Sequence, residues 1–269
     1  MTVAALICAR GGSKRIPRKN VAMCAGKKLI EWPLIAANEA KCIDRLFVST
    51  EDAEIAEVSR QHGAEIIDRP WQLATDFAAD GSLAYHAYSE IIKRCNADYI
   101  IKLHATSPCI EGYHIDEALQ LLLKNKIAVR VFTQHKIHKP SQLNNYYFFL
   151  PTGAICKVFP ENPLGIDPFI TNNLVDIYWQ NGAFSIERME KKFFCLAPEI
   201  PPDMDAVYAN DLYASYFARM DLARVQEARN ILLGYTMSQY DGHDINYPDD
   251  LIIAEAIIKI REEKKHAGK

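Results

Sequence analysis

Residues 9–20, with the sequence ARGGSKRIPRKN, carry the clearest chemical pattern in this chain. Gly11 and Gly12 allow a tight backbone turn that approaches a ligand closely. The backbone N–H groups of such a turn, together with Ser13, can cradle phosphate oxygens. The cations that can neutralise those phosphates are Arg10, Lys14 and Lys19. The segment contains neither GxxxxGKS/T nor GxGxxG, so it is not a Walker P-loop or a dinucleotide-binding turn. The alternative to a phosphate site is a solvated basic turn.

Charge is distributed unevenly around this segment. The chain has 31 Lys and Arg residues against 34 Asp and Glu residues, a net charge of −3. Seven basic residues and no acidic residue fall within residues 10–28, so the rest of the chain carries ten more acidic than basic side chains. A locally positive loop suits a small phosphorylated ligand, whereas the acidic remainder disfavours a nucleic-acid polymer.

Five further segments complete a family resemblance. They are FVSTED at 47–52, DRP at 68–70 with LATD at 73–76, LHATSP at 103–108, NGA at 181–183, and HDIN at 243–246 followed by DL at 250–251 and AE at 254–255. Together with residues 9–20, they resemble in type and order the motifs of the acylneuraminate cytidylyltransferases. That family includes the CMP-sialic acid and CMP-KDO synthetases. Each motif is weak by itself, but the ordered set is specific.

The resemblance implies a reaction and a set of site residues. CTP binds with its phosphates over the basic loop, an acceptor hydroxyl attacks the α-phosphorus, and pyrophosphate leaves, with Mg²⁺ or Mn²⁺ as the cofactor. The positions that match catalytic residues of the family are Arg10, Lys19 and Asp244. The positions that match its nucleotide site are Ala9, Gly11, Gly12, Ser13, Lys14, Asn20, Arg69 and Asp80. The positions that match its acceptor site are His104, Ser107, Asn181 and Gly182.

Some of these matches have structural alternatives. A carboxylate at Asp80 can accept a hydrogen bond from the amino group of cytosine, but ahead of Gly81 and Ser82 it suits a helix N-cap equally well. Asp244 matches the first metal carboxylate of the family, and one carboxylate with nucleotide phosphates can hold Mg²⁺. The alternative for Asp244 is a turn aspartate. Asn246 stands in place of the second metal carboxylate; its amide oxygen can bind a metal but brings no charge.

The acceptor side departs from the family pattern. His104 replaces the family's Gln and Ile110 its Arg. The residues that stand where the sialic acid enzymes have arginines are Thr171, Asn172 and Trp179. A carboxylate acceptor needs a cation or a hydrogen-bond donor opposite it, and the candidates are His104, Lys102 and Lys139.

Three hypotheses for the function follow. The first is CMP transfer to a sialic-acid-like (nonulosonic) or KDO-like sugar acid. The second is the same CMP transfer to a different acidic acceptor, such as a phosphonate. The third is a non-catalytic protein that binds CTP. A dehydrogenase is disfavoured because no GxGxxG pattern follows the first apolar run.

The elements that must position these residues alternate along the first half of the chain. Apolar runs predict strands at 3–8, 45–49, 64–67, 99–103 and 128–133, and helical periodicity predicts helices at 29–40, 53–62, 82–94 and 115–124. The alternation predicts an α/β fold with a Rossmann-like, mostly parallel sheet and helices on both faces. The resemblance implies that this sheet is of the nucleotide-diphospho-sugar transferase type. Ligands bind beyond the carboxyl ends of such strands, where residues 9–20 fall.

The alternation of predicted strands and helices ends after Gln134. Residues 135–186 predict an insertion, either a lid or a dimerisation element, with strands at 146–150 and 183–186. The nucleotidyltransferase domain then comprises residues 1–134 and 187–269. Residues 211–233 predict one or two helices ended by Gly234 as a left-handed cap, and 249–259 predict a last helix. The stretch at about 201–230 is extra helical sequence relative to the family pattern, either a subunit contact or a lid. By resemblance we expect a homodimer.

The composition excludes several other classes of protein. No apolar run reaches the length of about 18 residues that a membrane span requires, and the apolar start lacks the basic leader of a signal peptide. The seven cysteines are odd in number and contain no CxxC, so reduced thiols are predicted instead of disulfides or a zinc site. We therefore expect a cytoplasmic enzyme whose partners are CTP and a small acidic acceptor, with no nucleic-acid or membrane partner.

Overall fold

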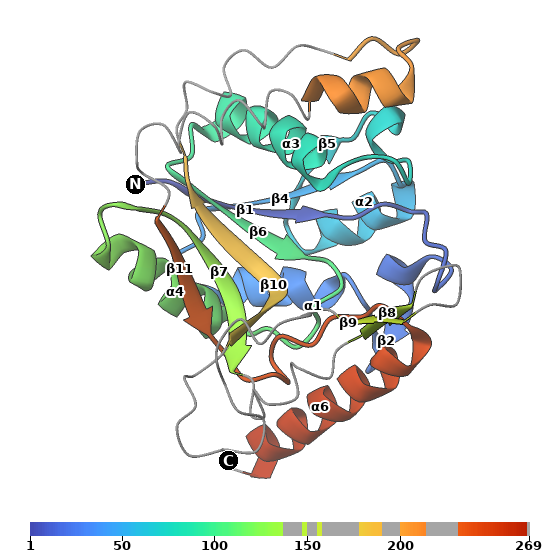
Figure 1. The fold of residues 1–269 in the computed structure, drawn as a ribbon. Helices are drawn as coiled ribbons and strands as arrows, with labels where there is room; N and C mark the ends of the chain where they lie inside the picture. Colours follow the sequence, from blue (N-terminus) through green and yellow to red (C-terminus); the bar gives the residue numbers. More distant parts are fainter. Residues whose placement is uncertain (137–146, 150–154, 158–177, 190–199, 214–230, 268–269) are drawn as a thin grey trace.

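The computed structural model describes residues 1–136, 147–149, 155–157, 178–189, 200–213 and 231–267. Its centre is a seven-stranded sheet in the order β11-β7-β10-β6-β1-β4-β5 (Figure 1). The strands are β1 (Val3–Cys8), β4 (Arg45–Thr50), β5 (Glu65–Asp68), β6 (Tyr99–His104), β7 (Ala128–Lys136), β10 (Tyr178–Arg188) and β11 (Ile231–Thr236). Only β10 runs antiparallel to its neighbours in this sheet. The predicted α/β fold with a mostly parallel sheet is confirmed.

Helices cover both faces of the sheet (Figure 1). The apolar cluster on one face includes side chains of α1 (Glu31–Glu39), α2 (Ala53–Gln61) and α4 (Gly112–Lys124). The cluster on the other face includes α3 (Asp80–Cys95) and Tyr213, which lies in a helical stretch whose described residues are 206–213. A third cluster joins α6 (Pro248–Ala267) to the hairpin of β2 (Met23–Cys24) and β3 (Lys27–Lys28). A second hairpin pairs β8 (Tyr147–Phe149) with β9 (Ile155–Lys157). None of the described helices is both long and apolar enough to cross a membrane.

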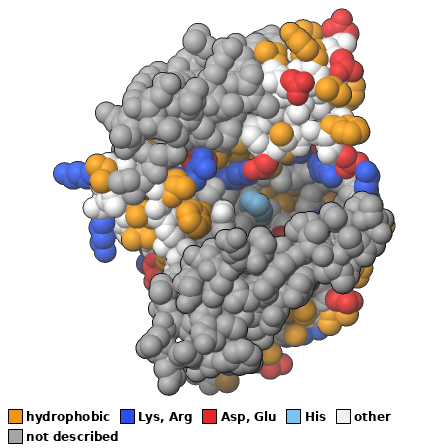
Figure 2. All heavy atoms as spheres, in the orientation of Figure 1, with side chains coloured by type: hydrophobic (Ala, Val, Ile, Leu, Met, Phe, Trp, Pro, Cys, Tyr) orange, Lys and Arg blue, Asp and Glu red, His pale blue; other side chains and the backbone are white. Residues whose placement is uncertain are grey.

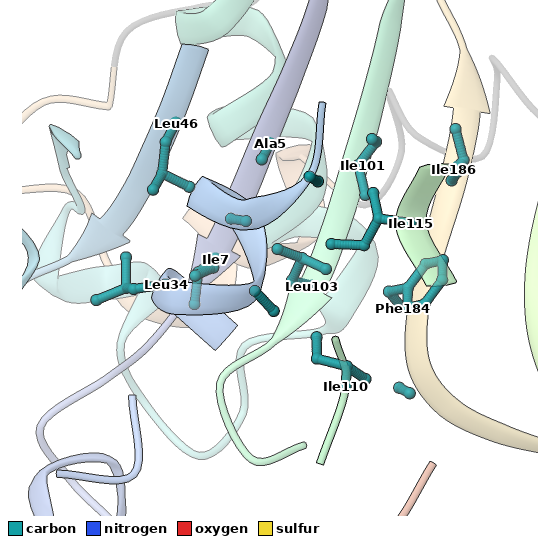
Figure 3. Packing of buried hydrophobic residues seen from close by; sticks show 14 of the residues in the cluster. Ala5, Ile7, Leu34, Leu46, Ile101, Leu103, Ile110, Ile115, Phe184 and Ile186 are labelled. Atoms are coloured by element: carbon teal, nitrogen blue, oxygen red, sulfur yellow. The ribbon is translucent and has the colours of Figure 1, made fainter. Parts of the chain in front are cut away.

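The apolar run of β1 explains why this strand lies at the centre of the sheet. Ala5 and Ile7 belong to the cluster that includes α1, as Figure 3 shows, while Ala4 and Leu6 belong to the cluster that includes α3. All four side chains are fully buried. Burial of a side chain the size of Leu6 contributes about 1.5–3 kcal/mol. The strand is therefore fixed from both faces, and its carboxyl end delivers residues 9–20 to one edge of the sheet.

The loop after β4 holds the start of α2 and also supports the basic segment. Asp52 is the N-cap of α2, and its carboxylate accepts hydrogen bonds from the backbone N–H groups of Glu54 and Ile55, both at 3.0 Å. The same carboxylate accepts two hydrogen bonds from the Arg18 guanidinium, at 2.9 and 3.0 Å. Residues 9–20 are thus tied to a helix that packs on the sheet.

The structure corrects one prediction, the helix end at Gly234. Residues 231–236 form strand β11, which pairs in parallel with β7. A short apolar run such as ILLGYT fits a buried strand as well as a helix, and pairing to β7 decides between them. Gly234 is needed for close packing, because a Cβ atom there would lie 2.4 Å from the Gln134 side chain. It is not a left-handed helix cap.

The end of the predicted insertion lies in the central sheet. Residues 178–186 belong to β10, which pairs with β6 on one side and β7 on the other. Of the remaining insertion, β8 at Tyr147–Phe149 falls where a strand is predicted, and most of the other residues lie outside the described part of the chain. The division into a transferase domain and an insertion stays a prediction.

Candidate active site

A pocket of about 460 Å³ opens at the carboxyl ends of β1 and β6. Figure 2 shows a hollowed face with Lys, Arg, Asp and Glu side chains gathered along it and a histidine in the hollow. Nine of the predicted site residues line the pocket: Arg10, Gly12, Ser13, Lys14, Lys19, Asn20, Arg69, Asp80 and His104. The fold therefore brings together residues that are up to 94 positions apart in the sequence.

The phosphate-loop backbone is shaped by its contacts with the loop after β4. The N–H of Gly11 donates to Glu51 Oε1 at 2.8 Å, and a Cβ atom on Gly11 would lie 2.3 Å from Asp52 Oδ2. Gly11 therefore allows a close approach that any larger residue would prevent. Gly12 has open space around it and lines the pocket. Asn20 donates from Nδ2 to the Arg10 carbonyl at 2.9 Å and so closes the loop on itself.

Two cations of the loop are bound by a carboxylate of the pocket wall. Arg10 lies 2.9 Å and Lys14 lies 2.7 Å from oxygens of Asp76. Hydrogen bonds from Lys14 and then Arg10 lower the pKa of Asp76, so its carboxylate is ionised at neutral pH. Asp76 thus lies where a phosphate could bind these two cations.

Lys19 joins the basic loop to the C-terminal motif. Its Nζ donates to the backbone carbonyl of Ile245 at 2.6 Å. Partial burial is the largest influence on this ammonium and lowers its pKa, although Asp244 acts in the opposite direction. The carbonyl contact ties the basic loop to the segment that carries Asp244. Arg15 makes a second connection, donating to Asn246 Oδ1 at 3.3 Å and lying over the Tyr247 ring.

The other cations of the basic stretch do not line the pocket. Arg18 binds Asp52 and Glu54, and Lys28 lies 2.8 Å from Glu54. Lys27 lies over the Trp32 ring, 5.3 Å from its centroid. These three cations fix the segment to its surroundings, and the four that line the pocket are Arg10, Lys14, Arg15 and Lys19.

Arg69 and Asn20 form the inner wall of the pocket. The Arg69 side chain is almost fully buried and donates to the Ser49 carbonyl at 2.7 Å. Asn20 Oδ1 is buried and has no hydrogen-bond partner among the described residues. Because a buried polar atom normally has a partner, this oxygen is available to a donor that a ligand supplies.

Asp80 is not a helix N-cap. Ala79 occupies the N-cap of α3, and no side chain caps the helix there. The Asp80 carboxylate instead contacts Lys102 Nζ, which lies 2.5 Å from both of its oxygens. Desolvation alone would raise the pKa of Asp80, but the Lys102 ammonium outweighs it and lowers that pKa. The cytosine role of Asp80 stays a prediction.

The predicted acceptor residues lie around the end of β6. Desolvation, with a contribution from Lys102, lowers the pKa of His104, so its imidazole is neutral at pH 7. Gly182 has a φ of 70°, and a Cβ atom on it would lie 3.9 Å from His104 Cε1. Asn181 is partly buried next to Gly242, and Ser107 is fully buried. Of the four residues, only His104 lines the pocket.

Asp244 lies beside the pocket and is held by two neighbours. Its Oδ1 accepts a 2.5 Å hydrogen bond from Thr106 Oγ1, and its Oδ2 accepts one from Asn246 Nδ2 at 2.7 Å. Asn246 therefore turns its amide nitrogen to Asp244 and its oxygen to Arg15. No group of three His, Cys, Asp or Glu side chains that could hold a metal occurs among the described residues. One carboxylate oxygen, completed by nucleotide phosphates and water, is nevertheless a ligand set that suits Mg²⁺.

Three residues of this site, Asp76, Thr106 and Arg15, were not predicted from the sequence as functional positions. Asp76 and Thr106 both fall within motifs that were recognised, but their contacts with Arg10 and Asp244 join segments far apart in the sequence. Arg15 is one of seven cations in a row, and nothing in the sequence distinguishes it from its neighbours. Ala9 and Gly11 support the loop without lining the pocket. The positions Lys139, Thr171 and Asn172 lie outside the described residues.

Comparison with known proteins agrees with the geometry. The model of the cytidylyltransferase family matches residues 4–147, which is just over half of the chain. The chain is 37% identical over 220 residues to N-acylneuraminate cytidylyltransferase A of Danio rerio, covering 76% of this chain and 48% of that protein. It is 34% identical over 126 residues to the CMP-N,N'-diacetyllegionaminic acid synthase of Legionella pneumophila, covering 45% of this chain and 53% of that protein.

A solved structure extends the agreement in fold to nearly the whole chain. CMP:2-keto-3-deoxy-manno-octonic acid synthetase complexed with CTP superposes with a TM-score of 0.63 at 16% identity, covering 97% of this chain and all of that one. The matched parts span between 27% and 53% of the length of the curated relatives. The sequence match, the shared fold and the basic loop at the end of β1 agree, and the chain belongs to the cytidylyltransferase family.

Proposed function

We propose that this protein transfers CMP from CTP to a hydroxyl group of a nonulosonic or KDO-like sugar acid and releases pyrophosphate. The observation that carries the proposal is the contact between Lys19 Nζ and the Ile245 carbonyl. This contact joins the phosphate loop to the segment of Asp244, so one pocket edge offers cations for a triphosphate and a carboxylate for a divalent metal. Proteins named for such transfers are among the relatives of this chain.

The chain's own contribution to this reaction is positioning and charge stabilisation. The acceptor oxygen forms a bond to the α-phosphorus while the bond from the α-phosphorus to the bridging oxygen of pyrophosphate breaks. Negative charge then grows on the phosphoryl oxygens and on the departing pyrophosphate. Arg10 and Lys19 are donors that can meet this charge in fixed positions, and preorganised donors of this kind supply much of the rate enhancement. Asp76 releases Arg10 and Lys14 when the triphosphate replaces it.

The acceptor side supports a hydroxyl nucleophile. A neutral His104, whose pKa is lowered by desolvation and by the Lys102 ammonium, can accept a hydrogen bond from the attacking hydroxyl and take its proton. Asp244 would hold Mg²⁺ or Mn²⁺, with Asn246 as a further candidate ligand. When bound, such an ion polarises a phosphoryl oxygen and neutralises charge on the nucleotide. Gly182 leaves room beside His104 for the acceptor.

The small number of cations at the β6 end of the pocket keeps a second class of acceptor under consideration. Among the described residues that line the pocket, the cations at the β6 end are limited to Lys102, which is bound to Asp80. A sugar carboxylate would need an additional donor. A different acid, such as a phosphonate, is the second acceptor class for the same CMP transfer, and it would need such a donor as well. We also propose a homodimer, with the part of the predicted insertion that precedes β10 as either its contact or a lid.

Pyrophosphate release tests these proposals together. The purified protein is incubated with Mg²⁺, each of the four nucleoside triphosphates in turn, and a panel of nonulosonic acids, KDO and phosphonates. Release that requires both CTP and a nonulosonic or KDO-like acid supports the first acceptor class. Release with CTP and only an unrelated acid transfers the proposal to the second class. No release with any acid, despite a CTP-dependent rise in melting temperature, would leave a non-catalytic CTP-binding protein.

A further inference from the structure

Residues 72–80, which we call the rim segment, supply both carboxylates of the described pocket lining, Asp76 and Asp80. The backbone N–H groups of Ala74 and Ala78 donate to carbonyls three positions earlier. Such local turns do not connect a segment with the rest of the fold. The position of the rim segment therefore depends on its contacts with distant parts of the chain.

One set of these contacts consists of ion pairs in the pocket. Asp76 binds Arg10 and Lys14, and Asp80 binds Lys102. The pair of Asp76 with Lys14 is open to solvent, with side chains that are 40% and 81% exposed, so its contribution is small. A triphosphate that binds Arg10 and Lys14 removes the Asp76 contacts altogether. With the nucleotide bound, the rim segment relies on its remaining contacts.

A second set of contacts joins the rim segment to residues 200–213, which we call the brace. Gln72 is almost fully buried, and its Nε2 donates to the carbonyls of Pro201, Pro202 and Met204 at 3.1, 3.2 and 3.3 Å. The side-chain amide has two hydrogens, so the three carbonyls share them. One side chain of the rim segment thus binds three backbone groups of the brace.

Asn210 of the brace binds the other end of the rim segment, where α3 begins. Its Oδ1 accepts a hydrogen bond from the Ala79 N–H at 2.7 Å, and its backbone carbonyl accepts one from Ser82 Oγ at 2.8 Å. Ala79 precedes Asp80, and the fully buried Ser82 follows it by two positions. Asn210 therefore fixes the chain on both sides of Asp80.

The brace is itself anchored to the fold. Asp205 caps its helical stretch at 206–213, where its Oδ1 accepts hydrogen bonds from two backbone N–H groups of the first turn at 2.9 and 3.2 Å. The buried Tyr213 packs edge to face against Tyr85 of α3, with ring centroids 5.7 Å apart. Figure 1 shows this helical stretch in orange. Because the brace is held by α3, it can hold the rim segment in turn.

We propose that the brace orders the rim segment for the nucleotide, and that Asn210 and Gln72 are positioning residues for CTP binding. The inference rests on the proposed function, because it takes CTP as the ligand. Neither residue lines the pocket, so both act through the rim segment and not on the substrate. The brace overlaps the stretch that is extra relative to the family pattern, and this role differs from the subunit contact or lid expected there.

Loosening the brace should weaken CTP binding. A freed rim segment has to be ordered again when the nucleotide binds, and ordering costs conformational entropy at every residue. Release of Arg10 and Lys14 from Asp76 acts in the opposite direction, but an exposed ion pair contributes little. The chemical step should be unaffected, because the groups proposed for catalysis lie on the phosphate loop, the end of β6 and the segment of Asp244.

The test measures the dissociation constant for CTP by calorimetry with Mg²⁺, and kcat and both KM values by pyrophosphate release. Asn210→Ala removes the acceptor of the Ala79 N–H, and Gln72→Met removes the amide donors from a side chain of similar length. Asn210 is partly exposed, so its variant tests the inference even if the buried Gln72→Met does not fold. Asn210→Asp keeps an acceptor oxygen and tests rescue.

The matched control is Asn38→Ala. Asn38 also joins two segments through its side-chain amide, which donates to the His62 carbonyl at 2.9 Å, and it lies outside the pocket lining. This control removes a comparable hydrogen bond from a part of the molecule that does not reach the rim segment. Melting temperatures of all variants are measured by circular dichroism.

We expect the dissociation constant and the KM for CTP to rise about three- to tenfold in Asn210→Ala and in Gln72→Met, the effect of one net hydrogen bond. The kcat and the KM for the acceptor should stay at the wild-type values. Asn210→Asp and Asn38→Ala should bind CTP as the wild type does.

An unchanged affinity for CTP with a lowered melting temperature would make the brace merely structural and overturn the inference. Tighter CTP binding would also overturn it, because the brace would then hold Asp76 against the nucleotide. A fall in kcat at unchanged KM would assign the brace to the chemical step instead. A wild-type protein that binds CTP but releases no pyrophosphate with any acid contradicts the proposed function alone, because the CTP affinities of the variants still decide the role of the brace.

Discussion

Replacement of Lys19 by alanine tests the connection between the phosphate loop and the Asp244 segment. Lys19 is a pocket-lining cation whose Nζ is fixed by the Ile245 carbonyl at 2.6 Å. Because this ammonium is held in place before the substrate arrives, it can stabilise developing charge without reorganising. Loss of one such preorganised donor costs about 2.7–4 kcal/mol in the transition state. We therefore expect kcat to fall about 100- to 1000-fold.

The same substitution removes one charge-assisted hydrogen bond from the folded state. Such a bond contributes about 1.5–3 kcal/mol, and the partial exposure of Lys19 favours the lower end. For a chain of this size each 1 kcal/mol changes the melting temperature by about 2–4 °C, so we expect a decrease of about 3–6 °C. The variant stays folded at 25 °C. The assays are pyrophosphate release at saturating CTP and Mg²⁺, and thermal unfolding followed by circular dichroism.

Two further variants make this test discriminating. Lys27→Ala removes a cation of the same basic stretch that lies over Trp32 and does not line the pocket, so its kcat should match the wild type. Lys19→Arg keeps the charge and should recover part of the rate. A kcat for Lys19→Ala within threefold of the wild type, or an equal loss in Lys27→Ala, would refute the reasoning.

Three other predictions follow from the contacts of the site. Asn246→Asp places a second carboxylate beside Asp244, so the Mg²⁺ concentration for half-maximal activity should fall severalfold; an unchanged midpoint would mean that position 246 is not a ligand. Asp76→Asn removes the internal competitor for Arg10, so CTP should bind about two- to fivefold more tightly by calorimetry, and weaker binding would show that Asp76 organises the loop instead. Asp52 has a lowered pKa, chiefly through its hydrogen bond from Arg18, so its contribution to stability is complete above the unfolded pKa of about 3.9 and is lost as the pH falls through the folded value. Asp52→Ala should therefore lower the free energy of unfolding by about 1–2 kcal/mol at pH 7 and by less below pH 4 in urea titrations, and a pH-independent loss would contradict this assignment.

The sequence predicted the fold well wherever local periodicity and burial agree. The predicted strand at 3–8 matches β1, and the predicted helices at 53–62 and 115–124 differ from α2 and α4 by three residues or fewer at each end. Each of these segments is apolar on the faces that it buries, so one pattern fixes both its type and its length. The strand at 231–236 was missed because six residues with four apolar side chains have no period of their own. Its type depends on β7, which lies about a hundred positions earlier.

The sequence predicted which types of residue form the candidate site, but not which of them contact one another. The glycines, Arg10 and Lys19 follow a buried strand, and their chemistry alone indicates a phosphate site. Asp80 was open between a helix cap and a base contact, and the ion pair with Lys102 removed the first alternative. No local pattern links these two residues, because one begins a helix and the other lies in a strand on the face that this helix covers.

The amino-acid sequence by itself determined that seven cations and no carboxylate follow the first strand within residues 10–28, a pattern that predicts a phosphate site. Only the tertiary structure decided which of those cations line the pocket. Arg18 and Lys28 are engaged by carboxylates of the α2 segment, and Lys27 lies over an aromatic ring, while four others line the pocket. The physical reason is that the attraction between two charges falls with distance and is largely screened beyond about 8–10 Å at physiological salt, so the nearest opposite charge dominates. Which charge is nearest depends on how the chain folds back on itself, and the order of the residues does not contain that distance.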